Sequence, residues 1–558
     1  MPFHPPRPPR PMLAAMAVIT AAALLAPAAA SASPRTNDPT APAPALGARA
    51  VPESLPAAEV ALRRAQALFG SRAATAARTV APRRVDSRSV TLVLRDLAAR
   101  LSELTGDDRS AAEAILARPS ESPDPGGFSW GGTPDESTCS ASLPLCVHWT
   151  TSGVHKPNLT DVDVNGVPDW VDTTLAQMET VWQAEVVSLG YRPPLADSTS
   201  SDDGGGSQLD VYLADIGGEG YYGYCTSDDP KLDLQLSPAT SAVSAYCVLD
   251  NDYSPAEFPA MTPTKNLQVT AAHEFFHAVQ FGYDYLEDRW LLESTAAWVE
   301  DVVFDTVDDN RQYLRSGPMR HPLAPLDKGK GGAQYGSWIF FRYLSEKYGD
   351  LVVRRIWEWA DDSTSQKSPN DLKTYSLPAI GKVLRARGTT LGKQFGDFAA
   401  ANTTPGVFYT EGAAYDPAAP TVRTVRPSRP ATRLLAQKLT HLSSLPVMVR
   451  AGPGTPPNAR LRVTVDGPGR ATGPAARVVV RFGDGSAVIK RIRLNPAGQG
   501  KVTVPLGTGS VSSVVVVLAN ASSRYRKCFL GSPFGGLSCW GGKPVDNGTL
   551  YSFRARLI

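Results

Sequence analysis

Two neighbouring stretches of the chain carry apolar residues at spacings of three and four, the pattern of helices that bury one face. In the first stretch the apolar positions are Val269, Ala272, Phe276 and Val279. In the second stretch they are Leu292, Ala296, Val299 and Val303. The sequence therefore predicts two consecutive helices, each packed against a core along one stripe.

Polar residues occupy a second face of the first predicted helix. His273 and His277 are one helical turn apart, so their side chains project together. Two imidazoles placed in this way can both bind one Zn²⁺, while Glu274 points at the open side of the metal. Zinc polarises a carbonyl and brings the pKa of bound water down to about 7. The pattern predicts a zinc site in which Glu274 is the general base.

A zinc site of this kind needs a third protein ligand. The metzincin extension would place Gly and His at positions 280 and 283, but this chain has Gln280 and Tyr283. On the second predicted helix, Glu293 and Glu300 share a face away from the apolar stripe. We expect Glu293 to be the third ligand and Glu300 to accept a hydrogen bond from a ligand histidine. Glu300 and Asp284 are the alternatives for the third ligand.

The alternative to a metal site is that the two histidines and Glu274 share this spacing by chance. Only 7 of the 558 residues are histidine, so this motif should arise by accident in roughly a few per thousand such sequences. The competing interpretation is a histidine pair that faces solvent or is satisfied within the core.

The two predicted helices resemble those of the gluzincins, metallopeptidases that combine HExxH with a glutamate on a downstream helix. The segment "LLESTAAWVE" at 291–300 is similar to the aminopeptidase-type "LNEGFAxYxE" helix. Ala297 stands where thermolysin-like enzymes carry an aspartate, and no GxMEN motif, which anchors a substrate's amino terminus in those aminopeptidases, occurs upstream. The resemblance implies a zinc endopeptidase rather than an aminopeptidase.

A further segment, "QYGSWIFFRYLSEKYG" at 334–349, resembles the aminopeptidase-type "YxKGxxLLxYL" segment, whose leading tyrosine stabilises the oxyanion. The resemblance implies that Tyr335 is this hydrogen-bond donor, a contribution worth roughly 3 to 4 kcal/mol in other oxyanion sites. His321 is a rival for the same role. The simpler interpretation is that Tyr335 begins a buried helix and only packs.

A longer resemblance covers roughly residues 145 to 360. It is to a family of secreted bacterial proteins that are predicted to be metalloproteases. The matching motifs are "HWTTSG", "GVPDWVD", "LDVYLAD", "GYYGY", "HEFFHAVQFGYD", "LLESTAAWVED" and "YGSWIFFRYL". This resemblance implies the zinc site more strongly than any particular substrate.

The segment "DVDVNGVPDWVD" at 161–172 has the spacing of a calcium-binding loop. Its oxygen donors would be Asp161, Asp163, Asn165, the carbonyl of Val167, Asp169 and Asp172. Gly166 falls where such a loop turns sharply, and Asp172 replaces the usual bidentate glutamate. The alternative is an Asn-Gly turn followed by an acidic first helical turn.

The N-terminus has the pattern of a signal peptide. Arg7 and Arg10 precede an apolar stretch at 12–26, and small residues follow at 30–32. The apolar stretch is too short for a confident membrane span, so we expect no integral membrane anchor. The 6 cysteines fall as close pairs, for which local disulfides are the simplest pairing although others fit the sequence. These features together predict a secreted, extracellular protein.

Composition divides the chain into five segments. They are a signal peptide at 1–32, a helical N-terminal region at 33–125, a zinc metallopeptidase domain at 126–415, a Pro-rich linker at 416–429 and a β-sandwich domain at 430–558. The helical region is either a propeptide or a small domain that stays attached. We therefore expect an α+β zincin-like metallopeptidase domain followed by an all-β sandwich domain, after a helical N-terminal pro-region. The strand pattern "SAYCVLD" at 244–250 is a candidate edge strand for an extended peptide.

Charge excludes one class of partner. The chain has 56 basic and 54 acidic residues, a net charge of +2, so no nucleic-acid partner is expected. The expected function is that of a secreted zinc-dependent endopeptidase acting on a protein or peptide. One alternative is a secreted binding or adhesion protein whose zinc unit is a scaffold and whose C-terminal β domain binds a wall polymer or protein. Another is a zinc hydrolase with a non-peptide substrate.

Overall fold

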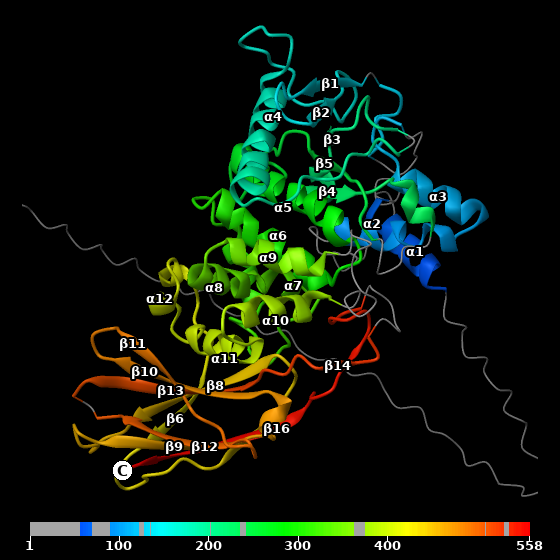
Figure 1. Ribbon diagram of the computed structural model, residues 1–558. Coiled ribbons are helices and arrows are strands. Elements are labelled where there is room, and N and C mark those ends of the chain that lie inside the picture. Colours follow the sequence, from blue (N-terminus) through cyan, green and yellow to red (C-terminus); the bar gives the residue numbers. More distant parts are fainter. Residues whose placement is uncertain are drawn as a thin grey trace, which may run out of the picture. The chain divides into compact units, whose positions relative to one another are not determined.

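The computed structural model describes residues 56–69, 90–121, 128–133, 135–200, 202–234, 241–361, 374–507, 509–528 and 535–558 (Figure 1). The predicted signal peptide at 1–32 lies outside these ranges, as does part of the N-terminal region at 33–125. The described residues belong to the unit Leu55–Ile558. Their fold is mixed α/β with several sheets, which agrees with the class expected from the sequence.

The first sheet has the strand order β1-β2-β3-β5-β4. Its strands are β1 (Glu136–Cys139), β2 (Leu145–Trp149), β3 (Leu209–Ala214), β4 (Gly223–Thr226) and β5 (Tyr246–Asp250). The three inner strands run parallel, whereas the two edge strands are antiparallel to their neighbours. The expectation that 244–250 forms the edge strand is wrong, because β5 pairs on both sides and β4 forms the edge next to it.

Two long helices follow this sheet, as the apolar spacing predicts. They are α5 (Pro263–Asp284) and α6 (Arg289–Val303), which lie side by side (Figure 1). Thr262 caps α5 by accepting a hydrogen bond from the Lys265 amide, and proline occupies the first turn, where its missing N–H costs nothing. From Leu292 to Asp301 every residue of α6 is buried, so its polar residues must find partners inside the protein.

The other α-helices of the described residues precede or follow these two in the chain. They are α1 (Ala57–Phe69), α2 (Val90–Ala98), α3 (Gly106–Leu116), α4 (Asp169–Trp182), α7 (Ala333–Gly336), α8 (Trp338–Tyr348), α9 (Leu351–Ala360), α10 (Ser376–Ala386), α11 (Leu391–Ala401) and α12 (Pro405–Phe408). A π-helix, Gln183–Ser188, continues α4. The helices α1, α2 and α3 confirm the helical character expected of the described part of the N-terminal region, and α2 packs against β4.

The C-terminal part is built from strands, as the alternating β-branched residues predict. They are β6 (Thr421–Val425), β7 (Leu435–Leu439), β8 (Ser443–Ala451), β9 (Arg460–Asp466), β10 (Pro474–Phe482), β11 (Ala487–Arg491), β12 (Gln499–Pro505), β13 (Val511–Asn520), β14 (Tyr525–Arg526), β15 (Lys543–Pro544) and β16 (Thr549–Leu557). Two sheets, β11-β10-β13-β8-β6 and β12-β9-β16-β7, contribute side chains to one hydrophobic core. Strand β6 lies inside the segment expected to be a linker, where its residues, mostly β-branched threonine and valine, pair with β8.

The three cysteine pairs form the local disulfides that the sequence favours. They join Cys139 to Cys146, Cys225 to Cys247 and Cys528 to Cys539. Such bonds are characteristic of oxidising compartments, so they are compatible with an extracellular protein. Within the described ranges, none of the helices has the length and apolar character needed to cross a bilayer.

Candidate metal centre

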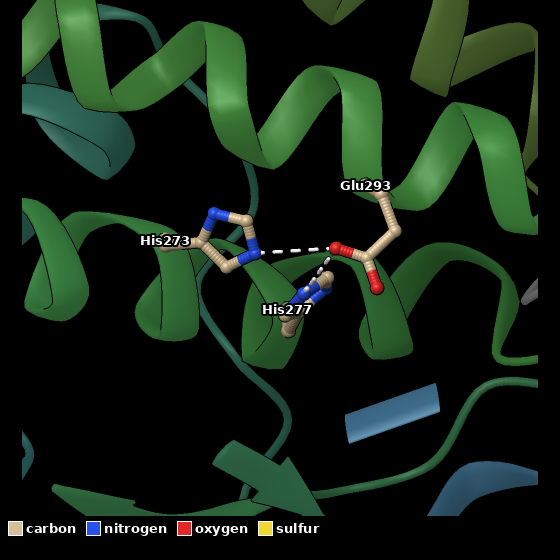
Figure 2. Close-up of side chains that lie close together, drawn as sticks. All are labelled: His273, His277 and Glu293. Carbon is tan, nitrogen blue, oxygen red and sulfur yellow. Dashed lines mark hydrogen bonds and ion pairs between the residues drawn. The ribbon is translucent and has the colours of Figure 1, made fainter. Parts of the chain in front are cut away.

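Helices α5 and α6 bring the three predicted zinc ligands together. His273 and His277 stand on successive turns of α5, and the carboxylate of Glu293 on α6 points toward both rings (Figure 2). Glu293 Oε2 lies 3.3 Å from His273 Nε2 and 3.7 Å from His277 Nε2. One donor atom from each of the three residues lies within 4.8 Å of the other two. Two imidazole nitrogens and one carboxylate oxygen are the donor set of a three-ligand zinc site.

The orientation of the His277 ring is fixed by Gln280. The Gln280 amide nitrogen donates to the Leu292 carbonyl and to Thr295 Oγ1, at 2.9 and 3.0 Å. Its oxygen must therefore be the atom that lies 2.7 Å from His277 Nδ1, and this ring nitrogen must be the donor. The neutral ring then has its lone pair on Nε2, the nitrogen that faces Glu293.

The ring of His273 is fixed in a comparable way by a carboxylate. Its Nδ1 lies 2.6 Å from Glu300 Oε1, which is the contact expected of Glu300 from the sequence. A ring N–H held by an outer carboxylate raises the basicity of the opposite nitrogen and orients it toward a metal. Both Nε2 atoms are thereby turned to the same point in front of Glu293.

Two of the candidate ligands have buried polar atoms without a hydrogen-bond partner among the described residues. Among the described residues, His277 Nε2 and Glu293 Oε1 have no hydrogen bond, and both side chains are fully buried. An unsatisfied buried polar atom costs about 1 to 3 kcal/mol, and more when the group is charged. The two orphaned atoms, together with the nature of the three donors, fit a zinc ion.

The electrostatics of the centre also favour a cation. Burial would lower the pKa of His273, but hydrogen bonds to Glu293 and Glu300 outweigh burial and raise it to about 10. Burial would raise the pKa of Glu293, but its contacts with His273 and His277 lower it to about 2. Without metal, the centre therefore holds a proton on His273 between two carboxylates. Metal binding would release that proton, because the ligands must be deprotonated.

Glu274, the predicted general base, extends toward β4 and α2. Its Oε2 accepts a hydrogen bond from Thr91 Oγ1 at 3.0 Å, and the residue is 5% exposed. A Cβ added to Gly223 would lie 3.0 Å from Glu274 Cγ and 2.7 Å from Thr270 Cγ2. Glycine at 223 therefore permits β4 to pass close to the face of α5 that carries Thr270 and Glu274.

The two rivals for the oxyanion donor lie in different surroundings. Tyr335 on α7 is buried, with its ring centroid 6.1 Å from that of His273 and 5.2 Å from that of Tyr313. His321 is exposed and lines a cavity of about 620 Å³ beside Arg320. The structure therefore brings Tyr335, rather than His321, next to a candidate ligand. Asp284, an alternative third ligand, instead accepts hydrogen bonds from Ser241 Oγ and the Leu286 amide.

The predicted calcium loop is folded around its acidic residues. Carboxylate oxygens of Asp161, Asp163 and Asp169 lie within 4.8 Å of one another. The amide of Gly166 donates to Asp161, and the Gly166 φ of 90° provides the expected sharp turn. Asn165 donates from its side chain to Asp172 at 2.9 Å. The oxygens suit a hard cation such as Ca²⁺, and the Val167 carbonyl stays a predicted ligand.

Sequence reasoning missed four residues around the centre. From the sequence, Gln280 counts only as a departure from the metzincin motif. The other three are Thr91 and Gly223, which lie far from the HExxH motif in the chain, and Glu185, which is on the π-helix. Burial raises the pKa of Glu185 well above its usual value, and nearby His273 opposes this effect. Among the described residues, neither Glu185 oxygen has a hydrogen-bond partner. Only the spacing of Gln280 from His277 could have been noticed in the sequence.

Comparisons with known proteins leave the family open. No family model and no curated protein matches the chain. A solved structure of infectious bursal disease virus Gt strain matches with 13% identity and a TM-score of 0.13, over 23% of this chain and 33% of that one. A family GH115 4-O-methyl-α-glucuronidase matches with 10% identity and a TM-score of 0.13, over 53% of this chain and 38% of that one. The chain thus spans between a third and two fifths of these structures, and neither match supports an inference about its fold or function.

Proposed function

We propose that this protein is a secreted zinc-dependent endopeptidase of the gluzincin type. The observation that carries the proposal is the convergence of His273 Nε2, His277 Nε2 and a Glu293 oxygen from two adjacent buried helices. Each imidazole is held through its other nitrogen, as expected of metal ligands. We include in this proposal that the fold is zincin-like and that the protein is related to secreted bacterial metalloproteases.

The chain's own residues would divide the chemistry between them. His273, His277 and Glu293 would hold zinc, which when bound polarises the scissile carbonyl and lowers the pKa of water. Glu274 would accept a proton from the attacking water at a carboxylate oxygen and pass it to the leaving amine. Tyr335, beside His273, would donate a hydrogen bond to the oxyanion. Glu300 and Gln280 would keep the two rings in position.

The loop at 161–172 would bind Ca²⁺ and stiffen the start of α4. Asp169 and Asp172, in the first turn of that helix, also suit the positive end of its dipole. Calcium added to the protein should raise its melting temperature, and Asp161→Asn should reduce the increase. An equal increase in both proteins would contradict calcium binding by this loop.

The substitution Glu274→Gln tests the proposed chemistry. It should leave the zinc content unchanged and abolish hydrolysis of casein or of a peptide library, because the amide cannot accept the proton. Wild type and variant are assayed intact and after limited proteolysis, so that a latent form is not mistaken for an inactive one. Hydrolysis by Glu274→Gln at the wild-type rate would contradict the mechanism. Bound zinc without hydrolysis in any wild-type form would favour the alternative of a binding protein with a zinc scaffold.

A further inference from the structure

We propose that helix α2 of the N-terminal region keeps the centre closed, so that the intact chain is a latent form of the enzyme. This inference rests on the proposed function. Thr91 on α2 contacts both Glu274, the candidate general base, and the backbone of β4, the edge strand beside it. An extended peptide approaching the centre along this edge would have to displace the same helix.

The Thr91 hydroxyl forms a bridge between these two groups. It donates to Glu274 Oε2 at 3.0 Å and accepts a hydrogen bond from the Cys225 amide, also at 3.0 Å. Cys225 faces Cys247 with a Cα separation of 4.1 Å, which is typical of a non-hydrogen-bonded antiparallel pair. Its N–H therefore points away from β5 toward the outer edge of the sheet, and α2 takes the hydrogen bond that an added strand would use.

The candidate centre is closed while α2 is in this position. His273 and Glu274 are each 5% exposed, and His277 and Glu293 are not exposed at all. Thr91 itself is 1% exposed, so the bridge is buried as well. A scissile peptide bond has to come within about 3 to 3.5 Å of the attacking group, together with its flanking residues. The closed arrangement gives a polypeptide substrate no such approach.

Helix α2 is held by both apolar and polar contacts. Five of its six apolar residues are fully buried; they are Val90, Leu92, Leu94, Leu97 and Ala98. Arg95 donates to the Glu287 carbonyl at 2.9 Å, and Asp96 accepts from Arg289 at 2.8 Å. These two contacts bind α2 to the segment that follows α5 and to the first residue of α6, the helix that carries Glu293. Helix α2 is therefore anchored to the same pair of helices that carries the candidate metal ligands.

A second anchor ties the N-terminal region to the sheet. Arg118, which follows α3, is fully buried and forms ion pairs with Asp197, Asp210 and Asp228. These contacts fix the segment that follows α3, and α3 in turn packs against α2. Release of α2 thus requires that this region be cut or that its docking be weakened.

Arg95→Ala in the full-length chain tests this latency. It removes the hydrogen bonds from α2 to the Tyr285 and Glu287 carbonyls without altering any proposed catalytic or zinc-binding residue. Arg109→Ala is the matched control, because its ion pair with Glu113 lies at the surface and stays within α3. Both variants and wild type are loaded with zinc to equal content. We expect kcat/KM for a casein-derived peptide to rise at least tenfold in Arg95→Ala and to stay at the wild-type value in Arg109→Ala.

Hydrogen exchange provides a readout that depends neither on activity nor on a variant. A peptide hydroxamate added to zinc-loaded wild type should accelerate amide exchange in residues 90–98, because its binding displaces α2. Binding of the hydroxamate with residues 90–98 still protected would overturn the latency. So would hydrolysis by intact wild type at the rate of Arg95→Ala. If the proposed function is wrong, the result is different: no form of the chain binds zinc or hydrolyses peptides. That result would also overturn the latency.

Discussion

The Nδ1 atom of His273 lies 2.6 Å from Oε1 of Glu300, although 27 residues separate them in the chain. This contact leaves Nε2 of the same ring facing Glu293 at 3.3 Å. One helix of the pair therefore supplies both the candidate third ligand and the group that orients the first. The contact predicts that Glu300 controls metal affinity without touching the metal.

Replacing Glu300 with glutamine should weaken zinc binding by roughly 10- to 100-fold, as loss of an outer hydrogen-bond partner typically does. The amide oxygen can still accept the hydrogen bond, but it lacks the charge that raises the basicity of the ring. Competition with a chromogenic chelator measures the affinity. Asp305→Asn, at an exposed position just beyond α6, is the control and should bind zinc as wild type does. Equal affinity in Glu300→Gln and wild type would refute the orienting role.

Gly223→Ala should destabilise the protein by about 1 to 3 kcal/mol, because a methyl group must enter a filled space. The new Cβ would lie 2.7 Å from Thr270 Cγ2 and 3.0 Å from Glu274 Cγ. Gly218→Ala is the control, since the nearest atom to its added Cβ is 3.6 Å away. Urea denaturation compares the two free energies of unfolding. Equal stability of the two variants would show that β4 does not press on α5.

Arg118→Met should cost about 3 to 5 kcal/mol, because removing one partner of a buried ion cluster leaves uncompensated charge. The carboxylates of Asp197 and Asp210 would remain in the protein interior, at 1% and 0% side-chain exposure. Arg109→Met, which loses a surface ion pair with Glu113 and a long hydrogen bond to the Leu101 carbonyl, should change the unfolding free energy by less than about 1 kcal/mol. Thermal unfolding followed by circular dichroism tests the difference. A melting temperature of Arg118→Met equal to that of the control would show that the N-terminal region is not anchored by this cluster.

The parts of the fold that the sequence predicted are those with local signals. Apolar spacing placed α5 and α6, and the same spacing put Glu293 and Glu300 on one face of α6. Close cysteine pairs and β-branched alternation were likewise sufficient for the disulfides and the C-terminal strands. Each of these inferences needs only a few adjacent turns or strand residues.

The features that were missed depend on contacts between distant segments. Thr91 and Glu274 are 183 residues apart, and nothing in either segment indicates the other. Strand β5 could not be distinguished from an edge strand, because pairing on its second side comes from β4. Gln280 has no recognisable motif, and its importance follows only from three hydrogen bonds that meet at one amide.

Metal analysis of the full-length chain tests the central claim most directly. After purification with zinc supplied and removal of loosely bound metal, plasma mass spectrometry should find about one zinc per wild-type chain, as expected for a single three-ligand site. The variants His277→Ala and Glu293→Ala should lose most of it, while Asp305→Asn keeps it. Wild type without zinc, or Glu293→Ala with an undiminished zinc content, would contradict the claim that these two helices form a metal centre.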